Sequence, residues 1–129
     1  MRTRERSIGT PCYFLATRDD HIAPWRSTYR GRRLMRGPSR FVLGEAGHVA
    51  GVVNPPASGK YGYWTNRRRP ADPEAWLARA ERHPGSWWPD WAAWLGRHGG
   101  RRVAARDPAR GALATIEDAP GRYVLTSSE

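Results

Sequence analysis

Residues 11–44, PCYFLATRDDHIAPWRSTYRGRRLMRGPSRFVLG, decide the fold. They begin with a short apolar run over residues 11–17, which predicts a strand with both faces buried. A proline at the first turn and aromatic residues at helical spacing favour a helix over residues 23–35. A second apolar run predicts a strand over residues 39–44. Strand, helix and strand at this spacing indicate two parallel strands joined by a right-handed crossover, and therefore an α/β fold.

The rest of the chain is expected to follow this unit as a tryptophan-rich loop and two helices. Residues 49–69 contain several Pro and Gly breakers and are predicted to be mostly loop. Asp72 is a favourable N-cap for a helix expected to run to about Arg82. Another helix is expected to start near Trp88 and to end at Gly96 or at the following glycine pair. Its apolar face combines residues at positions i, i+4, i+7 and i+8, namely Trp87, Trp91, Trp94 and Leu95.

Composition restricts the classes of protein to which the chain could belong. It has 129 residues, which fits one ordinary domain, and no 18-residue apolar stretch, so we expect no membrane span. The basic start lacks the apolar stretch of a secretory signal, and the cytoplasm is the expected compartment. One cysteine, Cys12, excludes an intrachain disulfide and a multi-cysteine zinc site, so neither a metal nor another cofactor is expected.

The net charge of +10 comes almost entirely from arginine, since Lys60 is the only lysine. Such an excess is compatible with a nucleic-acid partner. The arginines, however, are spread along the chain and form no single helix face. We therefore favour a solvated basic surface over a nucleic-acid site, and expect no nucleic-acid partner. The main groups are Arg30, Arg32, Arg33 and Arg36, then residues 67–69, then Arg101, Arg102, Arg106 and Arg110.

Two residues that follow the predicted strands could carry chemistry. Asp20 follows the first strand and His48 follows the second, and the carboxyl ends of parallel strands meet at the sheet edge where ligands bind. A carboxylate there can fix the tautomer of an imidazole and stabilise its charged form. Each residue taken alone has a simpler interpretation, because a loop Asp is often a turn residue and a lone His is often structural or exposed. Their order fits the acid and histidine of an α/β-hydrolase triad.

Several long motifs resemble the class I polyhydroxyalkanoate synthases. The resemblance covers roughly residues 9–124 and leaves the N-terminal segment 1–10 largely unmatched. We therefore expect residues 11–98 to form the C-terminal part of an α/β-hydrolase catalytic domain, with residues 99–129 as an Arg-, Gly- and Pro-rich tail. The matching runs are RDDHIAPWRSTY (18–29), FVLGEAGHVAGVVNPP (41–56), YGYWTN (61–66), DPEAWLA (72–78), HPGSWWPDWAAWL (83–95) and APGRYV (119–124).

The resemblance implies a reaction and a set of residues. These synthases polymerise (R)-3-hydroxyacyl groups from coenzyme A thioesters, release coenzyme A and act at the surface of polyester granules. Their acid maps onto Asp20 and their histidine onto His48, which would take the thiol proton of a cysteine nucleophile. Asp20 would orient His48 or help to deprotonate the 3-hydroxyl group of the incoming unit. His21, next to the acid in sequence, would support it, and Trp25 and Asn54 would shape the pocket.

The chain departs from the synthase pattern at the nucleophile. It contains no G-x-C-x-G motif, and Cys12 lies within the first strand with a bulky tyrosine after it. We interpret Cys12 as a structural core residue, although a nucleophile in a new arrangement is the alternative. The sheet would then be incomplete and the chain inactive alone, as expected for a fragment from a split, frameshifted or mis-started gene that depends on a partner fragment or an intact synthase.

Two other functions compete with this interpretation. The first is a non-catalytic module that binds a synthase or a granule surface, which exposed tryptophan faces would favour. The second is a small basic nucleic-acid-binding protein, since arginine and aromatic side chains can stack on bases. Salt-sensitive DNA binding would favour the second. The sequence does not determine acyl chain length or oligomeric state.

Overall fold

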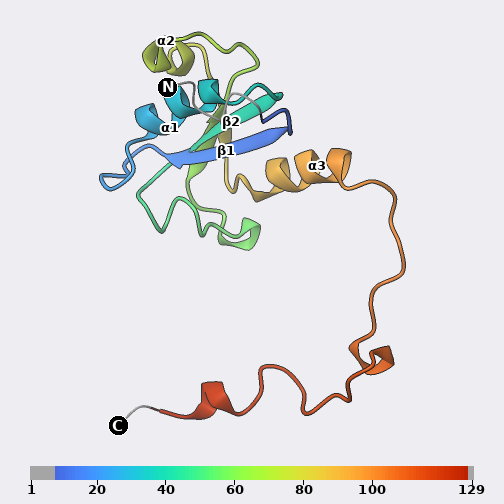
Figure 1. The fold of residues 1–129 in the computed structure, drawn as a ribbon. Helices are drawn as coiled ribbons and strands as arrows, with labels where there is room; N and C mark the ends of the chain where they lie inside the picture. The colour runs from blue at the N-terminus through green and yellow to red at the C-terminus, as the bar shows by residue number, and fades with distance from the viewer. Residues whose placement is uncertain (1–7, 128–129) are drawn as a thin grey trace, which may run out of the picture. The chain divides into compact units, whose positions relative to one another are not determined.

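The computed structural model describes residues 8–127, so most of the unmatched segment 1–10 lies outside the described residues. The chain forms two compact units, one up to Gly99 and one from Gly100 onward. Figure 1 shows the elements of the first unit. They are β1 (Cys12–Thr17), α1 (Trp25–Gly31), the 3-10 turn η2 (Arg32–Leu34), β2 (Ser39–Gly44), the 3-10 turn η3 (Pro56–Ser58), β3 (Gly62–Thr65), α2 (Pro73–Leu77), β4 (Glu81–Pro84) and α3 (Trp88–His98).

The four strands form one mixed sheet in the order β1-β2-β3-β4. β1 and β2 are parallel, in a register that pairs Cys12 with Ser39 and Thr17 with Gly44. The predicted pair of parallel strands with a helical crossover is therefore confirmed, and the chain is an α/β protein. β3 pairs antiparallel with β2, and β4 pairs antiparallel with β3.

The second half of the unit departs from the sequence predictions at two strands. Residues 49–69 are mostly loop, as predicted, but residues 62–65 form β3. The helix expected to reach about Arg82 ends at Leu77, and residues 81–84 form β4. The Asp72 carboxylate does accept a hydrogen bond from the Ala75 backbone N–H at 2.9 Å, as an N-cap should. Strand pairing outweighs local helix propensity here, because β4 satisfies backbone groups that β3 would otherwise expose.

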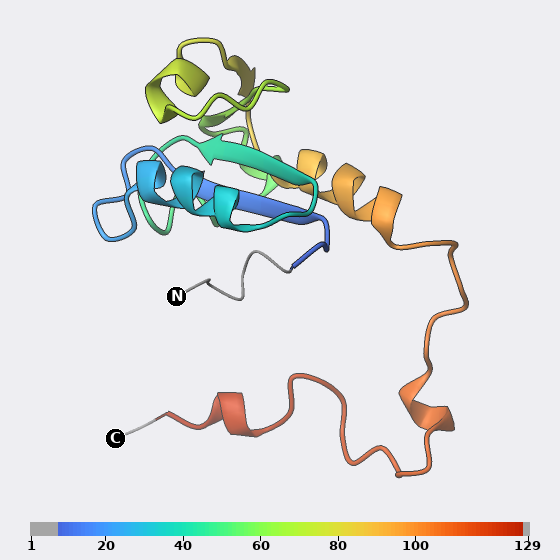
Figure 2. The same cartoon turned by 45° about the horizontal axis from the view of Figure 1, so that its top comes forward.

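The main apolar core lies on the face of the sheet that α1 and α2 cover. Side chains alternate along a strand, so Phe41 and Leu43 of β2 point to this face together. Phe41 contacts Tyr29 of α1 and Trp76 of α2 edge-to-face, with ring centroids 5.0 Å and 4.9 Å apart. Trp25 completes the cluster and is 2% exposed. Figure 2 shows α1 lying along β1.

α3 packs against the opposite face of β1 and β2. Tyr13 of β1 lies 5.5 Å from the Trp94 ring, and its hydroxyl donates to the Asp90 carboxylate at 2.9 Å. Arg40 of β2 forms two hydrogen bonds to the same carboxylate. Burial and the neighbouring Asp90 charge raise the pKa of Tyr13, so its hydroxyl remains a donor. The predicted helix end at the glycine pair is confirmed by Gly99 as the C-cap of α3.

The second unit, described from residue 100 to residue 127, contains two 3-10 turns, η4 (Pro108–Arg110) and η5 (Tyr123–Leu125). Arg122 pairs with Glu117 at 3.1 Å, an exposed contact that contributes little stability. Within residues 8–127, no helix is long and apolar enough to cross a bilayer.

Candidate active site

The carboxyl ends of β1 and β2 are tied together by backbone hydrogen bonds. The register brings Thr17 opposite Gly44 at the last pair of the ladder. Beyond it, the Arg18 N–H donates to the Gly44 carbonyl at 2.8 Å, and the Asp19 N–H donates to the Ala46 carbonyl at 3.0 Å. The loops after the two strands therefore begin side by side at one edge of the sheet.

Asp20 lies in the first of these loops and is held by three hydrogen bonds. Its Oδ1 atom accepts from the backbone N–H groups of Ile22 at 2.8 Å and Ala23 at 2.9 Å. Its Oδ2 atom lies 2.8 Å from His48 Nδ1. The Ala23 N–H and then the His48 ring lower the pKa of Asp20 to about 2. Asp20 is thus a carboxylate at neutral pH, although its side chain is only 8% exposed.

The Asp20 carboxylate determines which ring nitrogen of His48 carries the proton. An ionised carboxylate only accepts hydrogen bonds, so His48 Nδ1 carries the proton that lies between the two groups. The neutral ring then has its lone pair on Nε2, which has no hydrogen-bond partner among residues 8–127. The side chain is 52% exposed. His48 can therefore take a proton at Nε2 while the Asp20 carboxylate stabilises the resulting positive charge.

The turn that carries His48 depends on close packing of backbone atoms. Ala46 adopts a left-handed φ of 70°, which is strained for a residue with a β-carbon. The Gly51 N–H closes the turn by donating to the Gly47 carbonyl at 3.0 Å. Gly51 lies so close to Thr17 and Glu45 that a side chain there has no room. The backbone thus fixes the position of His48 beside Asp20.

Two tryptophans at the start of α3 hold the segment after His48, a role that sequence reasoning missed. The Trp87 indole N–H donates to the carbonyls of Gly51 and Val52, at 3.2 Å each. The Trp88 indole N–H donates to the Val52 carbonyl at 3.1 Å. The sequence indicated Trp87 only as part of an apolar face and Trp88 only as the start of a helix, and nothing local indicated which carbonyl groups they would bind.

The three residues expected to support the site have different surroundings. His21 is exposed and makes no side-chain hydrogen bond within the described part of the chain. Trp25 is buried in the core near Phe41, with ring centroids 6.5 Å apart, rather than in an open pocket. Asn54 is 3% exposed. It orders its own loop, donating to the Lys60 carbonyl at 3.0 Å and accepting from the Ser58 hydroxyl at 2.7 Å.

Cys12 lies far from the acid and the histidine. It is the first residue of β1, whereas Asp20 follows the last. Five strand steps of about 3.3 Å separate the two ends by roughly 16 Å. Cys12 is half-buried rather than fully buried, and its thiol donates to the Thr10 carbonyl at 3.3 Å.

Among residues 8–127, no three His, Cys, Asp or Glu side chains gather as a metal site would require.

Comparison with known proteins finds several polymerases similar to this chain. The poly(3-hydroxyalkanoate) polymerase subunit PhaC of Rhizobium etli is 51% identical over 120 residues, which is 93% of this chain and 19% of the relative. The subunit of the same name from Cupriavidus necator is 50% identical over 119 residues, covering 92% of this chain and 20% of the relative. Over about nine-tenths of its length, the chain is similar to poly(3-hydroxyalkanoate) polymerases.

The similarity covers only a part of each relative. A poly(3-hydroxyalkanoate) polymerase of Methylorubrum extorquens is 45% identical over 125 residues, which is 21% of its length. The chain thus spans about a fifth of the length of the curated polymerases it matches, and it corresponds to their C-terminal part. No protein-family model matches the chain. The expected resemblance to polyhydroxyalkanoate synthases is confirmed.

Proposed function

We propose that this chain is the part of an α/β-hydrolase-type polymerase that supplies the acid and the base of the active site. The reaction joins (R)-3-hydroxyacyl groups from coenzyme A thioesters into a polyester and releases coenzyme A. The observation that carries the proposal is the 2.8 Å hydrogen bond between His48 Nδ1 and Asp20 Oδ2, at the carboxyl ends of two parallel strands. That position is where α/β sheets bind ligands.

The proposed chemistry uses each group in one role. His48 Nε2 removes the proton of a cysteine thiol, and the thiolate attacks the carbonyl carbon of the thioester. The bond from that carbon to the coenzyme A sulfur breaks, and the proton on His48 passes to the departing sulfur. The Asp20 carboxylate stabilises the imidazolium ion between these two transfers. Asp20 also stands close enough to His48 to help it to deprotonate the 3-hydroxyl group of the next unit.

The nucleophile in this proposal comes from another part of the polymerase. Cys12 lies at the opposite end of β1 from Asp20, and the sequence holds no other cysteine. We therefore propose that the chain alone releases no coenzyme A. The proposed setting is the cytoplasm, at the surface of the polyester granule. His21, Trp25 and Asn54 remain proposed supports of the site.

The surroundings of the pair also favour a second candidate, a non-catalytic module that binds an intact synthase or a granule surface. Ile22, Val49 and Val53 are 66%, 67% and 62% exposed and flank Asp20 and His48 in sequence. Apolar side chains that cluster on a surface are typical of a contact region. The two candidates differ in whether His48 is needed once the rest of the polymerase is present.

A chimeric polymerase tests the proposal. The matched region of the Cupriavidus necator relative is replaced by this chain, and coenzyme A release from (R)-3-hydroxybutyryl-CoA is measured. We expect activity in the chimera, loss of at least a thousandfold in kcat with His48→Ala, and no change with Cys12→Ala. The chain without the rest of the polymerase is expected to match its own His48→Ala variant. Activity in the chimera that survives His48→Ala would favour the non-catalytic module.

A further inference from the structure

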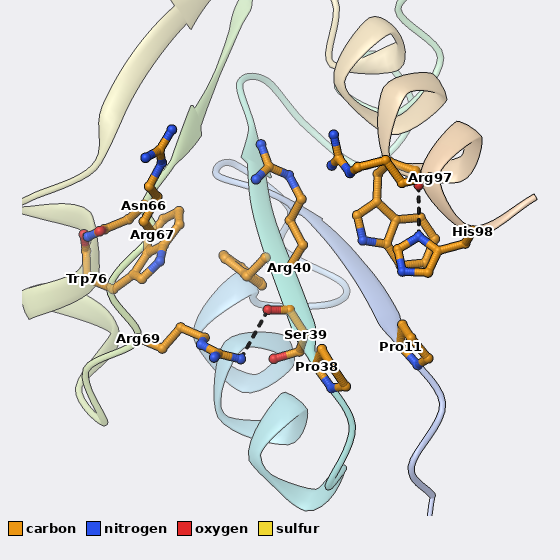
Figure 3. A pocket seen from close by; sticks show the side chains of 12 residues that line it. Pro11, Pro38, Ser39, Arg40, Asn66, Arg67, Arg69, Trp76, Arg97 and His98 are labelled. Atoms are coloured by element: carbon orange, nitrogen blue, oxygen red, sulfur yellow. Dashed lines mark hydrogen bonds between the residues drawn. The ribbon is translucent and has the colours of Figure 1, made fainter.

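A cavity of about 340 Å³ lies at the end of the sheet opposite His48. Figure 3 shows its walls, which come from the start of β2, the loop after β3 and the last turn of α3. Pro11 and Pro38, which precede β1 and β2, close its rim. The volume is at the lower end of the range for small-molecule sites, and the cavity takes no part in the chemistry proposed for Asp20 and His48.

The cavity is lined by positive charge. Arg40, Arg67, Arg69 and Arg97 contribute to its walls, and no Asp or Glu does. Arg40 is neutralised by the Asp90 carboxylate, to which it forms two hydrogen bonds. Within residues 8–127, the other three arginines form no ion pair with a carboxylate. Their mutual repulsion is unfavourable unless an anion lies between them.

Local structure accounts for some of these cations but not for all. Arg97 lies in the last turn of α3, where positive charge stabilises the carbonyl end of a helix. Arg69 reaches the Ser39 carbonyl only weakly, at 3.4 Å. Arg67 makes no side-chain hydrogen bond within the described residues. The antiparallel pairing of β2 with β3 carries residues 67 and 69 to the start of β2, so the charges gather although they are dispersed in sequence.

An aromatic wall completes the cavity. The Trp94 and His98 rings are in contact, with centroids 4.3 Å apart and planes tilted by 35°. The His98 Nδ1–H donates to the Trp94 carbonyl at 2.9 Å, since a carbonyl oxygen only accepts, and this fixes the orientation of the ring. The Trp76 side chain lines the cavity beside Arg69. A ligand with an apolar or aromatic part could therefore pack on one wall while its charge meets the arginines.

We propose that this cavity binds a doubly charged phosphate group, as inorganic phosphate or as the phosphate of a small monoester. A guanidinium group donates two parallel N–H bonds to a phosphate or a carboxylate, a geometry that an apolar ligand cannot use. Three guanidinium groups without carboxylate partners around one hollow supply more donors than a single charge requires. The proposal does not depend on the polymerase chemistry, because none of its residues is at the Asp20–His48 edge.

Calorimetric titration of the full chain at low salt tests the proposal. The probes are inorganic phosphate and phenyl phosphate, in a buffer of about pH 8 that keeps both largely dianionic. We expect saturable binding of one ligand per chain with Kd below about 1 mM. Tighter binding of phenyl phosphate would identify a monoester whose ring packs on the aromatic wall. Equal binding would identify the phosphate group alone as the ligand.

Charge-matched variants separate the cavity from the general positive charge. Arg67→Gln with Arg69→Gln is expected to weaken binding by about tenfold or more, because each removes a charged hydrogen bond. Arg33→Gln with Arg36→Gln removes the same charge from exposed positions outside the cavity and is expected to change Kd by less than about twofold.

The comparison of Kd values requires that every variant folds like the unchanged chain. Near-ultraviolet circular dichroism checks each variant, and Arg97→Gln, exposed on α3, offers a second test with little risk to the fold. Equal weakening by the two double variants would overturn the proposal, and so would an absence of saturable binding by either probe. Binding of duplex DNA without binding of either small phosphate would also overturn it, in favour of an extended nucleic-acid surface.

Discussion

Substitution of Gly51 by alanine should weaken both the fold and the position of His48. Gly51 takes no left-handed backbone conformation, so alanine is compatible with its φ angle and only space decides the outcome. A β-carbon there would meet the Glu45 carbonyl oxygen and lie 2.5 Å from Thr17 Cγ2 and 3.0 Å from the Gly47 carbonyl oxygen. Ordinary contacts of this kind are about 3.4–4 Å.

The cost follows from which atoms would have to move. Two of the three neighbours are backbone carbonyl oxygens, which cannot rotate away as the end of a flexible side chain can. Overpacking of this kind costs typically about 1–3 kcal/mol. The turn from Gly47 to Gly51 would open to relieve the clash, and His48 would shift away from Asp20. We therefore expect a loss of about 1–3 kcal/mol in the free energy of unfolding, together with a weaker acid–histidine contact.

Gly96→Ala provides a matched control. Gly96 lies inside α3, and a β-carbon there meets nothing within 4 Å. The same added methyl group should raise helix propensity and stabilise the chain by about 0.5–1 kcal/mol. Urea unfolding followed by circular dichroism measures both variants, and the chemical shifts of the His48 ring report the contact with Asp20. Equal stability of Gly51→Ala and the unchanged chain would refute the packing argument, as would a loss of the same size in Gly96→Ala.

Three further predictions concern Asp20 and the two faces of the sheet. The pKa of Asp20 in the folded chain is about 2, below the usual 3.8. Its contribution to the free energy of unfolding is therefore complete above pH about 4 and is lost as pH falls toward 2. Asp20→Asn should reduce the loss of stability at acid pH in a pH–stability curve. Trp76→Ala, at a site 1% exposed, should cost about 3–5 kcal/mol in thermal or urea unfolding, whereas Trp91→Ala, 41% exposed, should cost about 1 kcal/mol or less. Asp90→Asn leaves a half-buried guanidinium group and a tyrosine hydroxyl with a weaker partner, and it should lower the free energy of unfolding by about 1–3 kcal/mol. Glu74→Gln, in an exposed ion pair, should lower it by less than about 1 kcal/mol. Similar losses in the two variants would contradict the argument that burial strengthens the Asp90 contacts.

The elements predicted correctly from sequence are those whose signals are local. The apolar run of β1 and that of β2 each indicate a buried strand by themselves, and a helix of the right length lies between them. β3 and β4 are four residues each and contain Gly62 and Pro84, which argue against strands. Only their pairing with each other and with β2 stabilises them, and that pairing joins residues distant in sequence.

The candidate site divides in the same way. Asp20 and His48 could be predicted as neighbours because each directly follows a strand of a parallel pair. The indole hydrogen bonds of Trp87 and Trp88 could not, since they depend on where α3 lands relative to the His48 loop. The arginine-lined cavity also could not, because Arg67 reaches the start of β2 only through a strand that the sequence did not indicate.

The free edge of β1 links the stability of this chain to its proposed chemistry. Phe14 and Ala16 pack on the α1 face of β1 and Tyr13 packs on the α3 face, yet β2 is its only strand neighbour among residues 8–127. A strand covered on both faces with one open edge favours another strand beside it. Under the proposed function, the strand that pairs there comes from the rest of the polymerase. If it runs parallel, its carboxyl end falls beside Asp20, at the edge where a nucleophile must approach His48. Stability and coenzyme A release should therefore be restored together in the chimera, and a mutation that blocks the β1 edge should abolish both.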